Sequence, residues 1–234
     1  MIEVKNLCKN YGDYAAVSDV SFTAQTGQIV GFLGPNGAGK TTTIRMLSTY
    51  LPPSSGTATV AGFDVLTQAD QVRRRIGYLP ETPPLYGEMT VREYLKFVGE
   101  IKGVPRASLS ARIDEVMERC FVSDVRHKLC QHLSRGYRQR VGLAQAIIHE
   151  PEVIILDEPT SGLDPKQIIE IRQLIKSLGK DHTVLLSTHI LPEVSMVCNK
   201  VVIISRGRVV MESMLADLTR DKSLEQVFLD SVSR

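Results

Sequence analysis

A glycine-rich segment at residues 34–41 carries the strongest chemical signal in this chain. It reads Gly34-Pro35-Asn36-Gly37-Ala38-Gly39-Lys40-Thr41. The spacing G-x-x-x-x-G-K-T lets backbone N–H groups crowd around phosphate oxygens, while the lysine contacts the β- and γ-phosphates. The threonine hydroxyl can ligate Mg²⁺, and a helix that begins here adds the positive end of its dipole. The segment therefore predicts a nucleotide site with Mg²⁺, in which Lys40 is also a catalytic candidate.

The neighbours of this segment favour a phosphate site over an ordinary glycine-rich turn. Apolar residues 29–33 precede it as a buried strand would, and residues 41–47, which include Thr42, follow as a helix. A phosphate loop lies between a strand and a helix in this way, so we count Thr42 among the expected nucleotide contacts. Kinases, GTPases, motors and transport ATPases share the loop, so it does not choose among them.

Two adjacent carboxylates, Asp157 and Glu158, follow the apolar run 153–156. Ligands bind at the carboxyl ends of strands in an open α/β sheet, so both side chains are expected at the phosphate site. Asp157 is suited to the Mg²⁺ shell, because a hard cation on phosphates needs oxygen ligands. Glu158 is the candidate general base that polarises the attacking water. The alternative, two carboxylates that only cap the next helix, leaves Lys40 and Thr41 without the rest of a site.

His189 ends another apolar run, residues 184–188, and is expected at the same sheet edge. A lone histidine is usually structural. The strand-end position and the polar neighbours Ser187 and Thr188 favour a contact with the γ-phosphate, because either ring nitrogen can donate a hydrogen bond. His189 is therefore a catalytic candidate.

The elements that position these residues predict an α/β fold with a mostly parallel phosphate-loop core. Continuous apolar runs at 153–156, 184–186 and 201–204 are typical of strands buried on both faces of a parallel sheet. Short apolar runs with turn signals between residues 2 and 30 predict an N-terminal antiparallel sheet. Residues 90–150 show helical periodicity only, which predicts an inserted helical subdomain.

We expect one domain over residues 1–234. The core covers residues 1–82 and 151–212, the helical subdomain about 83–150, and a helical tail about 213–234. Pro83, Pro84 and Pro151 mark the edges of the helical insertion. A hairpin turn is expected at 206–208, and the two short helices of the tail are expected to pack on the core rather than on a partner.

Composition excludes several classes of protein. The 234 residues are 43% hydrophobic and carry 28 basic against 26 acidic side chains, so nucleic acid is not an expected partner. The four scattered cysteines argue against a disulfide framework and favour a reducing cytoplasm. The spacing of His127, Cys130 and His132 matches no common metal site. No signal peptide or run of about 20 apolar residues is present, so the chain is expected to be soluble by itself.

Six motifs in order make the chain resemble the ATP-binding subunits of ABC transporters from nearly end to end. Besides the phosphate loop, the carboxylate pair and His189, the family's signature corresponds to residues 133–140, its D-loop to 161–164 and its adenine-stacking aromatic to Tyr11. The resemblance implies that two copies sandwich ATP head-to-tail, with the phosphate loop of one facing the signature of the other. Ser134 and Gly136, at a helix start, and Asp164 are then expected nucleotide contacts.

The resemblance also implies separate partners and a place in the cell. The second ATP-binding subunit is an identical copy or a close paralogue, and the movement is passed to transmembrane subunits docked near Glu81 and Tyr86. The protein would then lie peripherally on the cytoplasmic face of the membrane. Residues 81–86, the signature variant and residues 223–229 resemble the ABC-2 type exporter branch.

Three positions depart from the family's usual pattern. Arg135 replaces a glycine and Tyr137 a glutamine within the signature, whereas Ser134 and Gly136 are retained. Glu81 stands where the loop between core and helical subdomain usually has glutamine. An ionised glutamate can only accept hydrogen bonds, so Glu81 is expected to contact Mg²⁺ or water beside the nucleotide.

Two other functions fit the sequence less well. A soluble ABC ATPase acting on ribosomes or DNA usually has two cassettes or a long coiled coil, and neither is present here. The balanced charge also weakens a nucleic-acid footprint. A phosphotransferase with the same phosphate loop would leave residues 133–140 and 161–164 without a role.

Overall fold

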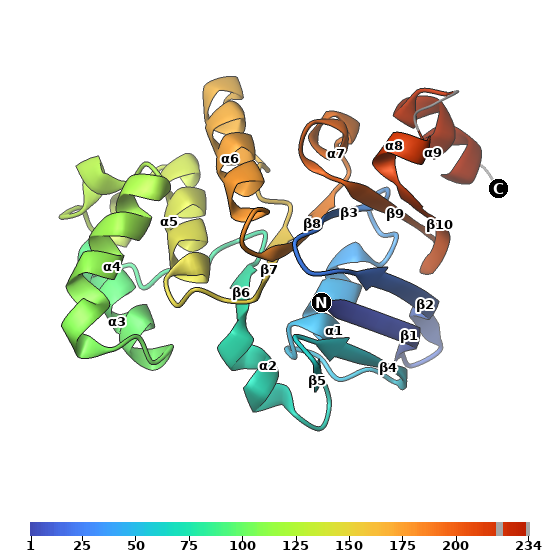
Figure 1. Ribbon diagram of the computed structural model, residues 1–234, viewed down its shortest axis with the longest axis horizontal. Coiled ribbons are helices and arrows are strands. Elements are labelled where there is room, and N and C mark those ends of the chain that lie inside the picture. Colours follow the sequence, from blue (N-terminus) through green and yellow to red (C-terminus); the bar gives the residue numbers. More distant parts are fainter. Residues whose placement is uncertain (219–221, 233–234) are drawn as a thin grey trace.

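The computed structural model describes residues 1–218 and 222–232, which form two sheets and a helical lobe (Figure 1). The smaller sheet has the order β2-β1-β4-β5 and is antiparallel. Its strands are β1 (Ile2–Tyr11), β2 (Tyr14–Ala24), β4 (Ser55–Val60) and β5 (Phe63–Asp64). This confirms the predicted N-terminal antiparallel sheet, to which β4 and β5 are additions.

The larger sheet has the order β10-β9-β3-β8-β7-β6, in which every pair except β10–β9 is parallel. Its strands are β3 (Ile29–Leu33), β6 (Ile76–Leu79), β7 (Val153–Asp157), β8 (Thr183–Thr188), β9 (Lys200–Ser205) and β10 (Arg208–Met214). The mostly parallel core is therefore confirmed. Residues 29–30 belong to this sheet and not to the antiparallel one, because β3 pairs with β8 and β9. The predicted hairpin at 206–208 joins β9 to β10.

The predicted helical segments after the phosphate loop, in the insertion and in the tail contain helices, and the helix at 69–75 is one that the sequence did not predict. They are α1 (Lys40–Leu47), α2 (Ala69–Arg75), α3 (Val91–Ile101), α4 (Arg106–Arg119), α5 (Arg135–Ile147), α6 (Pro165–Leu178), α7 (Leu191–Val197), α8 (Leu215–Leu218) and α9 (Leu224–Val232), with short 3-10 turns at Ser123–Val125 and Cys130–His132. Helix starts have local causes: Thr90 and Glu93 form a capping box on α3, and Asp164 caps α6 ahead of a proline.

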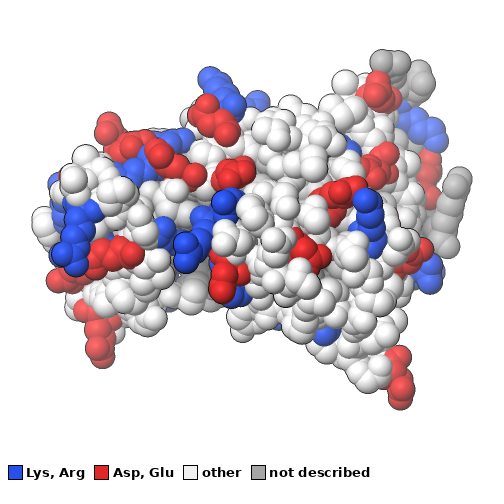
Figure 2. Space-filling model, turned by 60° about the horizontal axis from the view of Figure 1, so that its bottom comes forward, with Lys and Arg blue, Asp and Glu red and all other residues white. Residues whose placement is uncertain are grey.

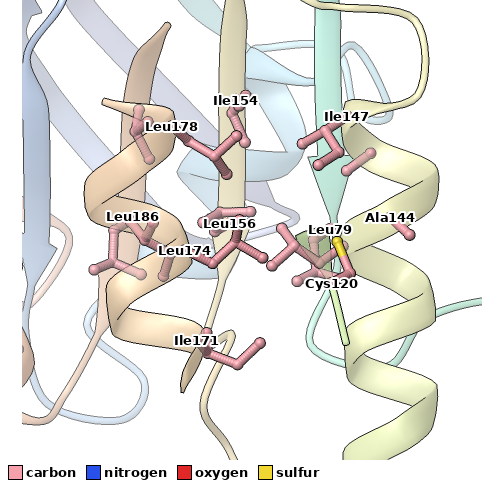
Figure 3. Packing of buried hydrophobic residues seen from close by; sticks show 14 of the residues in the cluster. Leu79, Cys120, Ala144, Ile147, Ile154, Leu156, Ile171, Leu174, Leu178 and Leu186 are labelled. Atoms are coloured by element: carbon pink, nitrogen blue, oxygen red, sulfur yellow. The ribbon is translucent and has the colours of Figure 1, made fainter. Parts of the chain in front are cut away.

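The larger sheet is buried on both faces. Along β7, Ile154 and Leu156 face one hydrophobic cluster, and Val153 and Ile155 face another. The first cluster fills the space between β7, α6 and α5, as Figure 3 shows. The second contains α1 and the antiparallel sheet. Burial on both faces explains why these strands are continuously apolar in the sequence.

The helical lobe, with α3, α4 and α5, lies at one end of the molecule (Figure 1). Close backbone contacts join it to the core at β6. A Cβ atom on Gly77 would lie 2.1 Å from the carbonyl oxygen of Ala146, and one on Gly142 would lie 2.7 Å from Leu79 and Pro83 side-chain atoms. Only glycine permits these approaches, so the end of α5 is pressed against β6.

The tail packs back on the core as predicted, because Leu224 and Val227 of α9 are buried in the first cluster. Within the described residues, no helix is both long enough and apolar enough to cross a bilayer. On the face shown in Figure 2, acidic and basic side chains are interspersed around a broad uncharged area.

Candidate nucleotide site

The phosphate loop connects β3 to α1 and adopts a backbone that its glycines allow. Gly37 and Gly39 have positive φ angles of 78° and 102°. A Cβ atom on Gly34 would lie 2.4 Å from the carbonyl oxygen of Ile204. Larger residues at these positions would strain or displace the loop. Its backbone leads directly into the start of α1, where N–H groups can bind an anion.

Lys40 is the first residue of α1 and is almost fully buried. Its ammonium group donates to the carbonyl oxygens of Gly34, at 2.8 Å, and Pro35, at 3.2 Å. The same nitrogen lies 3.4 Å from Glu158 Oε1. A phosphate held by Lys40 would therefore lie beside the Glu158 carboxylate, which is the arrangement needed for attack by an activated water.

Asp157 ends β7 and is buried beside two hydroxyl donors. Thr41 Oγ1 donates to Asp157 Oδ1 at 3.4 Å, and Ser187 donates to the same oxygen. Burial raises the pKa of Asp157, and the nearby Glu158 and Glu81 carboxylates add to the rise, while the two hydroxyl bonds oppose it. A cation bound here would relieve this repulsion.

Glu158 has an unusual backbone conformation, with a φ of 49°. A non-glycine residue in this region is strained and persists where its surroundings fix it. Its backbone N–H donates to the carbonyl oxygen of Ser187 at 3.1 Å, and its Oε2 lies 2.9 Å from Nδ1 of His189. The prediction that His189 and Glu158 share one sheet edge is confirmed.

These groups open into a cavity of about 480 Å³. Its lining is Tyr11, Tyr14, Ala16, Asn36, Gly37, Gly39, Lys40, Thr41, Thr42, Glu81, Glu158, Ser161 and His189. Sequence reasoning gave no role to Tyr14 or Ala16. Tyr14 pairs directly with Tyr11 across the β1–β2 turn, and this two-residue spacing is the signal that could have found it.

Six of the predicted nucleotide contacts do not line this cavity: Gly34, Pro35 and Ala38 within the phosphate loop, and Ser134, Gly136 and Asp164 outside it. Ser134 is the N-cap of α5, where its hydroxyl accepts from the N–H of Tyr137, and Asp164 is the N-cap of α6. A Cβ atom on Gly136 would lie 2.2 Å from the Gln167 side chain. Ser134, Gly136 and Asp164 are therefore not placed to contact a nucleotide bound at the phosphate loop of their own chain.

The two signature departures make contacts of their own. Arg135 donates from Nη2 to the Ser161 hydroxyl at 2.9 Å, and its guanidinium covers Gly162. The hydroxyl of Tyr137 donates to Asp124, and its ring lies 4.5 Å from the guanidinium carbon of Arg140. Arg135 thus joins the signature to a residue of the nucleotide cavity, and Tyr137 holds the signature helix inside its own lobe.

The donor set at the cavity fits Mg²⁺. Thr41 and Asp157 supply a hydroxyl and a carboxylate that already approach one another, and Glu81 adds a second carboxylate at the rim. Over the described part of the chain, no three His, Cys, Asp or Glu side chains form a metal cluster. A small set of protein ligands is sufficient for Mg²⁺, because this ion usually keeps several waters and also binds substrate phosphates.

Comparison with known proteins identifies the family. A family model described as ABC transporter matches residues 17–161. This chain belongs to the ABC transporter family. A further model, described as an AAA domain, matches residues 131–196.

Relatives and solved structures place the chain among ABC transporter ATP-binding proteins. NatA of Bacillus subtilis, an ABC transporter ATP-binding protein, is 40% identical, and the match covers 94% of this chain and 91% of NatA. The bacitracin transport ATP-binding protein BcrA of Bacillus licheniformis is 41% identical over 91% of this chain and 69% of BcrA. A structure titled as the ATP binding subunit of an ABC transporter is 31% identical, with a TM-score of 0.90 and 98% of each chain covered.

The fold and activity predicted from the motifs are thereby confirmed. The ABC cassette MJ0796, solved as a dimer, superposes with a TM-score of 0.85 at 26% identity over 92% of this chain and 99% of MJ0796. Another structure of MJ0796 is a dimeric post-hydrolysis state with ADP and Pi. This ABC protein binds ATP and hydrolyses it.

Proposed function

We propose that this ABC ATP-binding protein powers an exporter: two copies close head-to-tail around two Mg-ATP and move separate transmembrane subunits. One observation carries the proposal. The cavity is lined by phosphate-loop residues, Glu158 and His189, whereas Ser134 and Gly136 of the same chain do not line it. Their helix start is an anion site for a phosphate held by another copy, so each chain supplies half of two sites.

The proposal assigns a role to each residue of the site. Thr41, Asp157 and Glu81 would hold Mg²⁺, whose charge would offset that of the phosphates. Glu158 accepts the proton of the attacking water, and His189, whose Nδ1 lies 2.9 Å from Glu158 Oε2, contacts the γ-phosphate. Tyr11, exposed at the end of β1, stacks on the adenine. Asp164 contacts the nucleotide across the interface.

A docking surface for a transmembrane subunit is proposed where the core meets the helical lobe. A cavity of about 460 Å³ there is lined by side chains that include Tyr50, Tyr78, Pro80 and Pro84. Tyr86, in the adjoining loop, packs on Tyr94 and Phe97 and remains 54% exposed. An exposed tyrosine near a cavity with both apolar and basic walls suits a short amphipathic segment of a partner protein.

The charged side chains of the cavity indicate what kind of partner segment would bind there. The cavity lining includes Arg45, Arg73 and Lys102, and none of the described residues that line it is acidic. The partner segment is therefore expected to carry an acidic side chain among apolar ones. Docked in this way, the protein lies peripherally on the cytoplasmic face of the membrane. The export direction rests on similarity to BcrA, named for bacitracin transport, and to the daunorubicin resistance protein DrrA3 of Streptomyces coeruleorubidus.

The dimer is tested with Glu158→Gln, which keeps the shape of the side chain and removes the general base. With Mg-ATP this variant should elute as a dimer in size-exclusion chromatography with light scattering, and should not turn ATP over. Lys40→Ala is the control, and it should remain a monomer because it loses phosphate binding. A Glu158→Gln protein that binds ATP yet stays monomeric at millimolar nucleotide would overturn the sandwich.

Docking is tested with the tagged protein in detergent-solubilised membranes. The wild type should retain an integral membrane protein, identified by mass spectrometry, and Tyr86→Asp should lose it. Leu66→Asp, at an apolar residue that is 59% exposed and lines neither cavity, is the matched control and should retain it. Equal retention by both variants would contradict the docking surface.

A further inference from the structure

A buried carboxylate outside the motifs joins the two catalytic segments. Glu193 lies in α7, four residues after His189, and is 1% exposed. Its Oε2 accepts from the hydroxyl of Thr188 at 2.6 Å, and its Oε1 accepts from the hydroxyl of Thr160. A carboxylate is costly to bury, so one held by two hydroxyl donors from different segments needs a reason.

The two threonine donors lie close in sequence to the two catalytic candidates, His189 and Glu158. Thr188 directly precedes His189, and Thr160 follows Glu158 with only Pro159 between them. Proline fixes its own φ near −65°, so this link is short and stiff. The oxygens of one side chain therefore hold both segments at a set distance from each other.

The segments at 158–160 and 188–189 also make contacts within the nucleotide site. His189 Nδ1 lies 2.9 Å from Glu158 Oε2, and Glu158 keeps its strained φ of 49°. The carbonyl oxygen of Thr188 also accepts from the N–H of Gly34, at 3.4 Å, at the start of the phosphate loop. Strain of this kind persists only where neighbouring contacts over-determine the backbone, and the Glu193 carboxylate supplies two such contacts.

We propose that Glu193 is a positioning residue for ATP hydrolysis: through Thr160 and Thr188, its carboxylate sets the position of Glu158 relative to His189. Glu193 does not touch the nucleotide cavity. Its effect falls on the catalytic step and not on nucleotide binding, because the phosphate loop makes its main contacts without it. The proposal rests on ATP hydrolysis alone, and neither the dimer nor the membrane partner enters it.

The test removes one hydroxyl at a time. Thr160→Val and Thr188→Val keep the side-chain shape and delete one bond to Glu193 each. Misplacing a catalytic group by about 1 Å can cost on the order of 100-fold, so we expect kcat to fall about 10- to 100-fold while the KM for ATP changes less than about 2-fold. Thr183→Val is the matched control: Thr183 is a buried threonine of the same strand whose hydroxyl donates to the Gln25 carbonyl oxygen.

Two further measurements separate positioning from stability. The imidazole resonances of His189, assigned with His189→Gln, should shift in Thr188→Val and stay unchanged in Thr183→Val. In a Glu193→Gln background, where the carboxylate is already lost, Thr160→Val should have less effect than in the wild type, because both changes break one network. The single threonine variants keep the test valid if Glu193→Gln does not fold.

The results that overturn the proposal are specific. If Thr160→Val and Thr188→Val lose no more kcat than Thr183→Val, the carboxylate only stabilises the fold. The same conclusion follows if kcat and KM change in parallel with the melting temperature, or if His189 resonances are unaffected.

Discussion

Arg135 Nη2 donates to the Ser161 hydroxyl at 2.9 Å, which ties the start of α5 to the loop before α6 within one chain. Ser161 lines the nucleotide cavity, and Arg135 begins the helix that carries the signature. The family more often has glycine at this position, and glycine could not make this bond. A contact between helical lobe and nucleotide cavity is thus added by one side chain.

Removing this contact should loosen the loop at residues 161–163. A hydrogen bond of this type contributes roughly 1 kcal/mol, so Arg135→Gly should speed amide exchange there about 5-fold, measured by hydrogen–deuterium exchange mass spectrometry. Ser161→Ala should have the same effect, and the double variant no more than either. Arg138→Gly, at an exposed arginine in the same turn, is the control. Additive effects of the two changes would show that they act independently.

Glu81→Gln should weaken Mg²⁺ binding. Glu81 lines the cavity near Asp157, and its negative charge contributes to the raised pKa of that carboxyl. Losing one carboxylate from the cation site should raise the Mg²⁺ concentration for half-maximal hydrolysis about 3- to 10-fold, a change of roughly 1 kcal/mol. The measurement is ATP hydrolysis against Mg²⁺ at saturating nucleotide. Glu88→Gln, an exposed glutamate in the same connecting segment, should leave the curve unchanged. A curve unaltered by Glu81→Gln would limit Glu81 to a mechanical link.

His149 should make the protein less stable in mild acid. Burial lowers the pKa of His149 to about 4, and the charges of Lys102 and Arg112 add to the shift. The folded pKa lies below the unfolded value of about 6.5, so the unfolded chain binds the proton first. The contribution of neutral His149 to the free energy of unfolding is therefore fully present above about pH 6.5. It is lost as the pH falls towards 4, by up to about 3 kcal/mol.

Urea unfolding of wild type and His149→Gln between pH 7 and pH 4 checks this expectation. The variant cannot take up the proton, so the free energy of unfolding should fall less steeply with acid than in the wild type. Parallel curves would show that His149 is already accessible to protons in the folded protein.

Gly142→Ala should destabilise the protein even though alanine is the better helix former. The added Cβ would lie 2.7 Å from atoms of Leu79 and Pro83, and overpacking of this kind typically costs about 1–3 kcal/mol, more than the roughly 1 kcal/mol gained from helix propensity. Gly136→Ala is the comparison in the same helix. There the added Cβ meets the end of the Gln167 side chain, which can move aside, so the loss in melting temperature should be smaller. Equal losses would contradict this account.

The sequence predicted the groups whose role depends on residue type at a fixed spacing. Lys40, Asp157 and Glu158 could be assigned because each follows a buried strand in a pattern that phosphate chemistry requires. Glu193 could not be assigned, since its role arises from contacts between segments distant in sequence. Tyr14 was missed although its spacing from Tyr11 is a usable signal. Strand β6 was missed because Gly77 interrupts its apolar pattern, and only the approach of Ala146 explains that glycine.

The contact between β6 and the end of α5 also determines how far the other end of α5 would move when the helix rotates. Gly77 and Gly142 press the last turns of α5 against the core, whereas Ser134 caps its far end. The distance along the helix from Ser134 to Ala146 is about 18 Å, so a rotation of about 10° around the β6 contact would move the signature by about 3 Å. A small rotation of α5 about its glycine contacts with β6 would therefore move Ser134, at the other end of the helix, by about the length of a hydrogen bond.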